Sequence, residues 1–299
     1  MAEQVTFPVS DDLEGERLDK VLADYFAIAR SAARDLVGQG VLVDGVKASA
    51  SDRLQEGQKV QSPRPETSVD LVAEPVSFDV LLEDDQTIVV DKPAGLVVHP
   101  GAGNRRGTLA AGLVYRYPEL RDVGPPQRAG LVHRLDKDTS GTLLVARTLA
   151  SYQSLVGALR RRQIERVYLA LVEGSMSADT GTIEAPIGGD PARPTRRAVI
   201  HGGKPARTHY QVLEEVAGGR FTLLEVTLET GRTHQIRVHL AAISHPVVGD
   251  RVYGTGRSEA PRMFLHAARL SFQHPGTGEH ITVASPMPED LAGALARMR

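Results

Sequence analysis

The chain has 299 residues, 35 of them basic and 37 acidic, and it contains no cysteine. The near-neutral balance excludes a polycationic nucleic-acid coat, and the missing cysteines exclude disulfides, cysteine-ligated zinc and thiol catalysis. No apolar run approaches the about 20 residues of a membrane span, and the chain begins without a basic, apolar leader. We therefore expect no membrane association and a cytoplasmic location, and the length suggests about two domains.

The first 63 residues predict a small domain of two helices and short strands. Apolar residues at helical spacing predict a helix over 18–26, and Ser31 is a candidate N-cap for a second helix that ends at Gly38 or Gly40. Asp44 followed by Gly45, between apolar pairs, predicts a two-residue hairpin turn.

This order of elements resembles the alpha-L (S-four-type) RNA-binding module. The resemblance implies that the second helix and the hairpin contact RNA, through Arg30, Arg34 and Lys47. Residues 1–63 hold seven basic and eleven acidic residues, a net charge of −4, whereas phosphate contact requires local positive charge. The alternative is that these charges only solvate the surface.

A proline-rich polar stretch, residues 64–76, predicts a linker to a larger domain over 77–299. Patterning in that domain predicts further elements. The expected strands are 78–82, 87–91, 96–98, 205–216 and 221–229, and the expected helices are 108–117, 151–162, 233–243 and 288–298.

The charged stretch HRLDKDTSG, residues 133–141, lies between the apolar runs 130–132 and 142–145. The β-branched residues on both sides predict two strands with a loop between them. Two carboxylates, an arginine, a lysine and a histidine gather in this loop, and loops on a rigid sheet often carry catalytic groups. The alternative is an ordinary solvated turn.

Several blocks in order resemble the pseudouridine synthases of the RluA/RluD type, which isomerise uridine in structured RNA. The blocks are 82–100, 133–141, 165–172, 231–250 and 265–267, within residues 78–285. The resemblance implies an α+β fold, with a mixed, mainly antiparallel sheet split by a central cleft. It also implies an isomerase that needs no cofactor and acts on 23S-type ribosomal RNA, with transfer RNA as the alternative substrate. We expect a monomer, and a dimer is the alternative.

The resemblance also implies roles for five residues. Asp136 matches the catalytic carboxylate, and Arg237 matches the arginine that pairs with it and favours its ionised form. Tyr168 matches the tyrosine that stacks on the target base and can act as acid or base, although a core tyrosine is the alternative. Leu265 matches the apolar residue on the other side of the base, and Arg134 matches the arginine that fills the space left by the flipped uridine.

The part of the chain from residue 151 onward has 18 basic and 14 acidic residues, a net charge of +4. This basic surface predicts a cradle for RNA phosphates, and a solvated face is the alternative. The predicted contacts are Arg160, Arg161, Arg162, Arg166, Arg196, Arg197 and Lys204.

Five histidines lie in or beside the blocks: His99, His133, His234, His239 and His266. Their spacing matches no familiar metal motif, so we expect no metal and predict that they bind the loop or the phosphates, His133 among the RNA contacts. Two other classes of function stay open, namely a non-catalytic RNA-binding or ribosome-assembly protein and a metal-dependent phosphodiesterase. Insensitivity to a chelator would exclude the phosphodiesterase.

Overall fold

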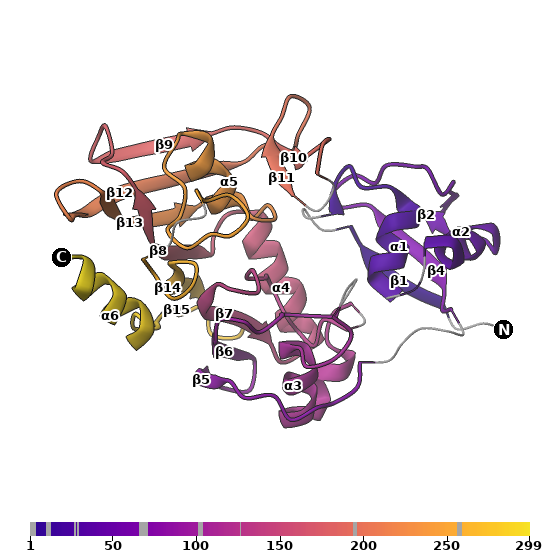
Figure 1. Cartoon of the computed structure of the whole chain (residues 1–299). Coiled ribbons are helices and arrows are strands. Elements are labelled where there is room, and N and C mark those ends of the chain that lie inside the picture. Colours follow the sequence, from indigo (N-terminus) through magenta and orange to yellow (C-terminus); the bar gives the residue numbers. More distant parts are fainter. Residues whose placement is uncertain are drawn as a thin grey trace. The chain divides into compact units, whose positions relative to one another are not determined.

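The structure, a computed structural model, describes residues 4–9, 13–26, 28, 30–65, 71–100, 104–125, 127–193, 196–255 and 259–299. The chain divides into two compact units. Figure 1 labels the helices and strands of the chain. Unit one comprises Met1–Ser77, Val97–Leu131 and Arg147–Tyr152, and unit two comprises Phe78–Leu96, Val132–Ala146 and Gln153–Arg299.

The N-terminal part of unit one has a small antiparallel sheet in the order β1-β4-β2-β3. Its elements are β1 (Gln4–Pro8), α1 (Leu18–Phe26), α2 (Arg30–Gly38), β2 (Leu42–Val43), β3 (Val46–Lys47) and β4 (Lys59–Pro63). Phe7, Leu22 and Phe26 are among the buried residues of its own apolar core. Both predicted helices and the hairpin are confirmed. The Ser31 cap is wrong, because α2 begins at Arg30 and Ser31 lies inside it.

Unit one also contains α3 (Leu109–Arg116), the 3-10 helix η2 (Pro118–Asp122) and the start of α4 (Leu149–Arg160). Thr108 caps α3 by accepting the Ala111 N–H at 3.3 Å. The prediction that α4 begins at Ser151 is wrong. The hydroxyl of Thr148 accepts the Ser151 N–H at 3.1 Å, so the helix begins earlier. The strand predicted over 96–98 is absent from the described residues, where Val97 forms only an isolated bridge.

Unit two is built on a nine-stranded sheet in the order β5-β6-β7-β14-β8-β13-β12-β9, with β15 paired to β14. The strands are β5 (Asp79–Glu83), β6 (Thr87–Lys92), β7 (Ser140–Ala146), β8 (Glu165–Glu173), β9 (Thr180–Glu184), β12 (Arg207–Val216), β13 (Phe221–Leu228), β14 (Leu265–Gln273) and β15 (His280–Ala284). All neighbours pair antiparallel except β7 and β14. The α+β class with a mixed, mainly antiparallel sheet is confirmed.

The pairing of β7 with β14 joins segments far apart in the sequence. Gly141, at φ 114°, lies so close to the backbone of Ala267 that a Cβ would collide with its carbonyl oxygen. The glycine that ends the charged stretch is therefore required where β7 meets β14. Residues 130–132 form no named strand, so the predicted strand before the loop is wrong, although Val132 N–H donates to Leu144 O at 3.1 Å.

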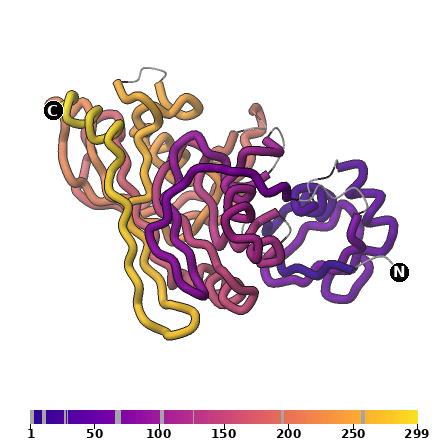
Figure 2. The backbone as a smooth tube through the Cα atoms, turned by 90° about the horizontal axis from the view of Figure 1, so that it is seen from below, coloured from indigo at the N-terminus to yellow at the C-terminus, as the bar shows by residue number. Residues whose placement is uncertain are grey.

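Three further features complete unit two. Helices α5 (Gln235–Ala242) and α6 (Glu289–Met298) confirm two predicted helices, and Figure 2 shows β14 and β15 as a long hairpin before α6 at the C-terminus. A short hairpin of β10 (Ile187–Gly189) and β11 (Arg197–Val199) forms a separate two-stranded sheet. In the described ranges of the chain, no helix has the length and apolar character needed to cross a membrane.

Candidate active site

Asp136 lies in the loop that leads into β7, and a buried lysine holds this loop. The Lys92 ammonium donates to the carbonyl oxygens of Pro93 at 2.7 Å, Leu96 at 3.0 Å and Lys137 at 3.0 Å. Burial lowers the pKa of Lys92 to about 7, while the negative charge of Asp136 opposes this shift. Three acceptors are the full complement of an ammonium group. Lys92 thus ties the loop to the end of β6, a role that sequence reasoning missed.

The Asp136 carboxylate is paired with Arg237 from the first turn of α5. Arg237 Nη1 donates to Asp136 Oδ2 at 2.9 Å, while Nε and Nη2 donate to Asp250 at 2.6 and 3.0 Å. Asp250 also accepts the backbone N–H groups of Val252 and Tyr253. One guanidinium therefore joins two carboxylates. Because the group is planar, its two hydrogen bonds to Asp250 also fix the direction of the Nη1–H that it donates to Asp136.

Asp250 is the second functional residue that sequence reasoning missed. Its side chain is buried, and burial alone would raise its pKa, but hydrogen bonds and the charge of Arg237 hold the pKa below its ordinary value. The pKa of Arg237 is raised because these two carboxylates outweigh its burial. Gly249 and Asp250 were recognised as part of a family block. No local sequence pattern indicated that Asp250 binds Arg237.

Tyr168 and Leu265 lie on one face of the sheet. Tyr168 on β8 is paired with Ala267 on β14, and Leu265 is paired with Ala170. Because residues two apart point to the same side of a strand, these four side chains share a face. Both Tyr168 and Leu265 are buried. Burial raises the pKa of the Tyr168 phenol, and the charge of Asp136 raises it further, so the hydroxyl keeps its proton at neutral pH.

Two of the histidines make contacts that bind elements of unit two together. His239 Nε2 donates to the Ala185 carbonyl at 2.9 Å, and His239 Nδ1 lies 2.9 Å from Thr208 Oγ1. His266 contacts Ser140 Oγ and the Ser285 carbonyl, both at 3.0 Å. Burial lowers the pKa of each, which favours the neutral form. Among the residues that the structure describes, no group of three or more potential ligands could hold a metal ion.

Comparison with known proteins identifies the family. A profile described as RNA pseudouridylate synthase matches residues 86–242. The "Ribosomal large subunit pseudouridine synthase D" of Nitrosomonas europaea is 44% identical over 308 residues, covering 99% of this chain and 88% of the relative. This chain belongs to the RNA pseudouridylate synthase family. The predicted family and the predicted enzyme class, an isomerase that forms pseudouridine in RNA, are confirmed.

Other similarities extend over most of this pseudouridine synthase. The "Ribosomal large subunit pseudouridine synthase D" of Pseudomonas aeruginosa is 41% identical, covering 96% of this chain and 93% of the relative. The solved structure "Human RNA Pseudouridylate Synthase Domain Containing 1" is 30% identical, with a TM-score of 0.59, covering 74% of this chain and 89% of that one.

The predicted base-flipping residues of the synthase differ in their surroundings. Arg134 is exposed in the same loop as Asp136, two residues before it. His133 instead points inward, because its Nε2 accepts the Leu144 N–H at 3.2 Å. Burial lowers the pKa of His133 to about 3, so it is neutral. In this structure His133 supports β7, and its predicted RNA contact stays a prediction.

The predicted phosphate contacts near α4 are only partly at the surface. Arg161 and Arg162 are exposed, and Arg162 pairs with Glu229 at 2.8 Å. Arg160, the last residue of α4, is half-buried. Arg166 is only 7% exposed and donates to the Leu228 carbonyl at 3.5 Å. β8 therefore turns the Arg166 side chain inward in this structure, and its predicted RNA contact stays a prediction.

The β10–β11 hairpin gathers the other predicted cations of the synthase. Arg197 lies in β11, Arg196 precedes it, and Lys204 forms an isolated bridge with Ile187 of β10. All three cationic residues are half-buried. The hairpin is thus a second basic element of unit two, separate in sequence from the end of α4.

In the N-terminal module, two of the three predicted RNA contacts converge on one carboxylate. Arg30 and Arg34 donate to the fully buried Asp19 at 2.9 and 3.1 Å, as Arg17 does at 3.1 Å. The hydrogen bond from Arg17, followed by those of the other arginines, holds the pKa of Asp19 well below its usual range despite burial. Lys47 on β3 is exposed. The three arginines and Asp19 leave a local excess of positive charge.

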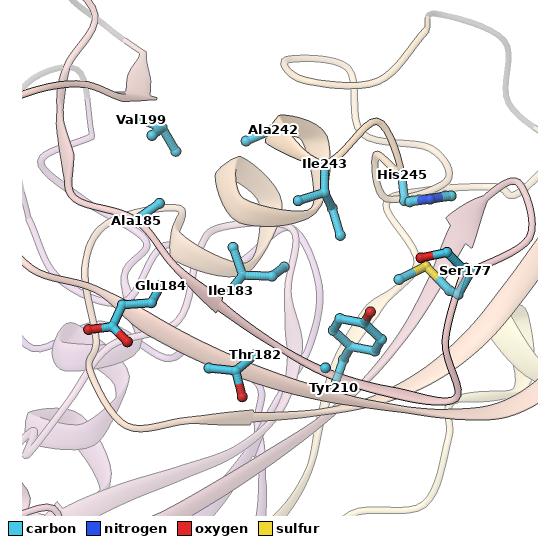
Figure 3. A pocket seen from close by; sticks show the side chains of 12 residues that line it. Ser177, Thr182, Ile183, Glu184, Ala185, Val199, Tyr210, Ala242, Ile243 and His245 are labelled. Carbon is cyan, nitrogen blue, oxygen red and sulfur yellow. The ribbon is translucent and has the colours of Figure 1, made fainter.

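A cavity of about 540 Å³ opens in unit two between β9, β12 and the end of α5 (Figure 3). Thr182, Tyr210, Ile243 and His245 are among its lining residues. None of the predicted site residues lines it. The cavity is therefore separate from the Asp136 site, which lies at the other end of α5.

Proposed function

We propose that this chain converts uridine to pseudouridine in large-subunit ribosomal RNA, with Asp136 as the nucleophile. The observation that carries the proposal is the arrangement of Asp136, Arg237 and Asp250, in which one carboxylate oxygen is bound and the other is available. The ribosomal substrate is supported by relatives with that printed name, which match 96–99% of this chain.

The reaction breaks the bond between ribose C1′ and ring N1, turns the uracil, and forms a bond between C1′ and ring C5. The proton on C5 is lost and N1 gains one, so no oxidant or phosphate donor is needed. Asp136 Oδ1 lacks the hydrogen bond that Arg237 donates to Oδ2, which makes Oδ1 the attacking oxygen. The bond that Oδ1 forms to the nucleoside breaks again before the product leaves, so Asp136 returns as a carboxylate. Such covalent catalysis divides one difficult step into two easier ones.

The shared face of Tyr168 and Leu265 would hold the flipped base. Stacking on an aromatic ring stabilises a base by about 1–3 kcal/mol. The protonated Tyr168 phenol can donate a hydrogen bond or a proton to the uracil. Arg134, exposed beside the site, would occupy the place that the uridine leaves, because flipping costs a few kcal/mol of stacking.

The remaining parts of the chain would hold the RNA. We propose that residues 1–63 are the S-four-type module, 64–76 the linker and 77–299 the catalytic domain. The module's separate apolar core and the exposed sides of Arg30 and Arg34 support this division. Arg161, Arg162 and the basic hairpin would contact phosphates, which position RNA without reading its sequence.

The proposed function also implies where the chain works, its oligomeric state and its need for a cofactor. An enzyme of ribosomal RNA would work in the cytoplasm, as a monomer, without membrane contact. It would need no cofactor, because isomerisation involves no net oxidation or reduction and side chains can carry the proton.

The test offers the purified full chain three unmodified transcripts: large-subunit ribosomal RNA, small-subunit ribosomal RNA and a transfer RNA mixture. Pseudouridine is mapped by position, with chelator present. We expect conversion at discrete sites of the large-subunit transcript. Conversion of transfer RNA alone would overturn the ribosomal substrate, and tight binding without conversion of any RNA would overturn the enzymatic proposal.

A further inference from the structure

His234 faces the available oxygen of Asp136, and it has no part in the reaction steps proposed for Asp136, Tyr168 and Arg134. Its Nε2 lies 4.0 Å from Asp136 Oδ1, while Arg237 binds Oδ2 at 2.9 Å. A separation of 4.0 Å is longer than a hydrogen bond. The imidazole therefore lies beside the attacking oxygen without occupying its lone pair.

The backbone at His234 has an uncommon conformation. His234 is the N-cap residue of α5, with φ 59° and ψ 21°, in the left-handed region. Histidine enters this region more readily than most residues, but only where its surroundings hold it there. The hydrogen bond from the Val238 N–H to the His234 carbonyl, at 2.9 Å, is one such contact. His234 therefore stands at the start of the helix that also carries Arg237.

Tyr253 contacts the other ring nitrogen. Its hydroxyl lies 2.9 Å from His234 Nδ1 and accepts the backbone N–H of Arg197 at 2.9 Å. The tyrosine ring also packs under the Arg237 guanidinium, 5.0 Å from its centroid. The Tyr253 oxygen already accepts one N–H and still has its own hydrogen to donate, and donation of that hydrogen to His234 Nδ1 requires that Nδ1 carries none.

The hydrogen of the neutral ring is then on Nε2, toward Asp136. The opposite tautomer would aim a lone pair at the carboxylate, which is electrostatically unfavourable. We propose that Tyr253 fixes His234 in this tautomer and that His234 is a positioning residue that orients Asp136 Oδ1 for attack. The proposal rests on the proposed function. Through the Arg197 N–H, it also links the basic β10–β11 hairpin to Asp136, and β11 lies beside α5 (Figure 1).

The charges around the ring keep it neutral. Burial lowers the pKa of His234 most, the negative charges of Asp136 and Asp250 raise it, and Arg237 and Arg134 lower it, with a net lowering. A protonated ring would form an ion pair with Oδ1, and both oxygens of Asp136 would then be occupied. We therefore expect the rate of the chemical step to fall as the pH decreases through the His234 pKa, which lies below 6.5.

The first test needs no RNA and reads the tautomer by ¹⁵N NMR of the histidine rings in the full chain, with His234→Gln to assign the signal. We expect Nε2 protonated and Nδ1 unprotonated at neutral pH, and a mixture of tautomers in Tyr253→Phe. A wild-type ring protonated on Nδ1, or an unchanged tautomer in Tyr253→Phe, would overturn the proposal. This outcome is independent of whether the chain converts uridine.

The second test measures single-turnover conversion of the RNA that the wild type modifies. Tyr253→Phe should lower the rate by roughly tenfold to a hundredfold, as for groups that orient a catalytic ligand, with KM changed less than threefold. Tyr210→Phe, a tyrosine at the separate cavity, is the matched control and should leave the rate unchanged. Equal rates for the two variants would overturn the proposal.

The pH profile separates a positioning role from a structural one. His234→Gln keeps an amide donor but cannot titrate, so its lower rate should lack the acidic decrease of the wild type. Retention of that decrease in His234→Gln would contradict the role of His234. A wild type that converts no uridine would instead refute the proposed function.

Discussion

Replacing Asp250 by asparagine removes the charge that holds Arg237 and keeps the shape of the side chain. Arg237 donates through two nitrogens to Asp250 and through one to Asp136, so the variant leaves the guanidinium with one carboxylate. Breaking a buried ion pair costs about 3–5 kcal/mol when the remaining charge has no partner. Because Asp136 remains, we expect a loss of about 2–3 kcal/mol in the free energy of unfolding.

The activity should fall as well, because Arg237 is no longer held from both sides. A displacement of the Asp136 oxygen by about 1 Å would lower the single-turnover rate roughly a hundredfold. Urea unfolding followed by circular dichroism gives the stability, and single-turnover conversion of RNA gives the rate.

The matched control for Asp250→Asn is Asp290→Asn. Asp290 accepts a similar pair of hydrogen bonds from Arg262, at 2.6 and 3.1 Å, but its side chain is 43% exposed. An exposed pair contributes about 0–1 kcal/mol, so the control should lose at most that much. If Asp250→Asn costs no more than Asp290→Asn, the buried Arg237 pair does not organise the site and the reasoning is refuted.

Three other predictions concern the loop, the sheet and the base. Lys92→Met leaves three buried carbonyls without their donor and should cost about 3 kcal/mol in urea unfolding; an unchanged midpoint would contradict the role of Lys92 as the loop's anchor. His133 has a pKa of about 3 in the folded protein and about 6.5 when unfolded. The unfolded chain therefore binds its proton more tightly, and stability present above pH 6.5 should fall by about 2 kcal/mol at pH 5; a His133→Gln variant with the same pH slope would refute this. Tyr168→Phe keeps the aromatic face, so RNA affinity should change less than threefold while the single-turnover rate falls roughly a hundredfold; an unchanged rate would exclude the hydroxyl from proton transfer.

Local signals in the sequence predicted much of the fold. The Asp44-Gly45 turn has φ of 50° and 79° at its two residues, as the hairpin pattern requires. The expected helix over 108–117 is α3, although Thr108 caps that helix instead of lying inside it. Strands with alternating or continuous apolar residues, such as β6 and β13, were predicted from the sequence because apolar patterning is a local property.

Long-range contacts were not visible in the same way. The parallel pairing of β7 with β14 joins Gly141 to Ala267, and no local pattern encodes that partner. Residues 130–132 are as apolar as a strand, yet they only flank β7. Asp250 and Tyr253 act through Arg237 and His234, and these partners are set by tertiary packing and not by spacing.

The candidate site also divides into features that the sequence indicated and features that only the folded structure shows. Resemblance indicated Asp136 and Arg237, which the structure brings to 2.9 Å. A count of positive charges predicted the RNA contacts, but charge alone does not tell a surface arginine from Arg166, which β8 turns inward.

Asp136 is the residue to which we assign the chemistry, and the same loop supplies a control residue, Asp138. Asp138 is exposed two residues away, so Asp138→Asn removes the same charge from the same loop. The decisive measurement is position-mapped pseudouridine in large-subunit ribosomal RNA treated with wild type, Asp136→Asn and Asp138→Asn. We predict conversion by wild type and Asp138→Asn at the same sites and none by Asp136→Asn. Conversion by Asp136→Asn at a rate near that of wild type would contradict the account.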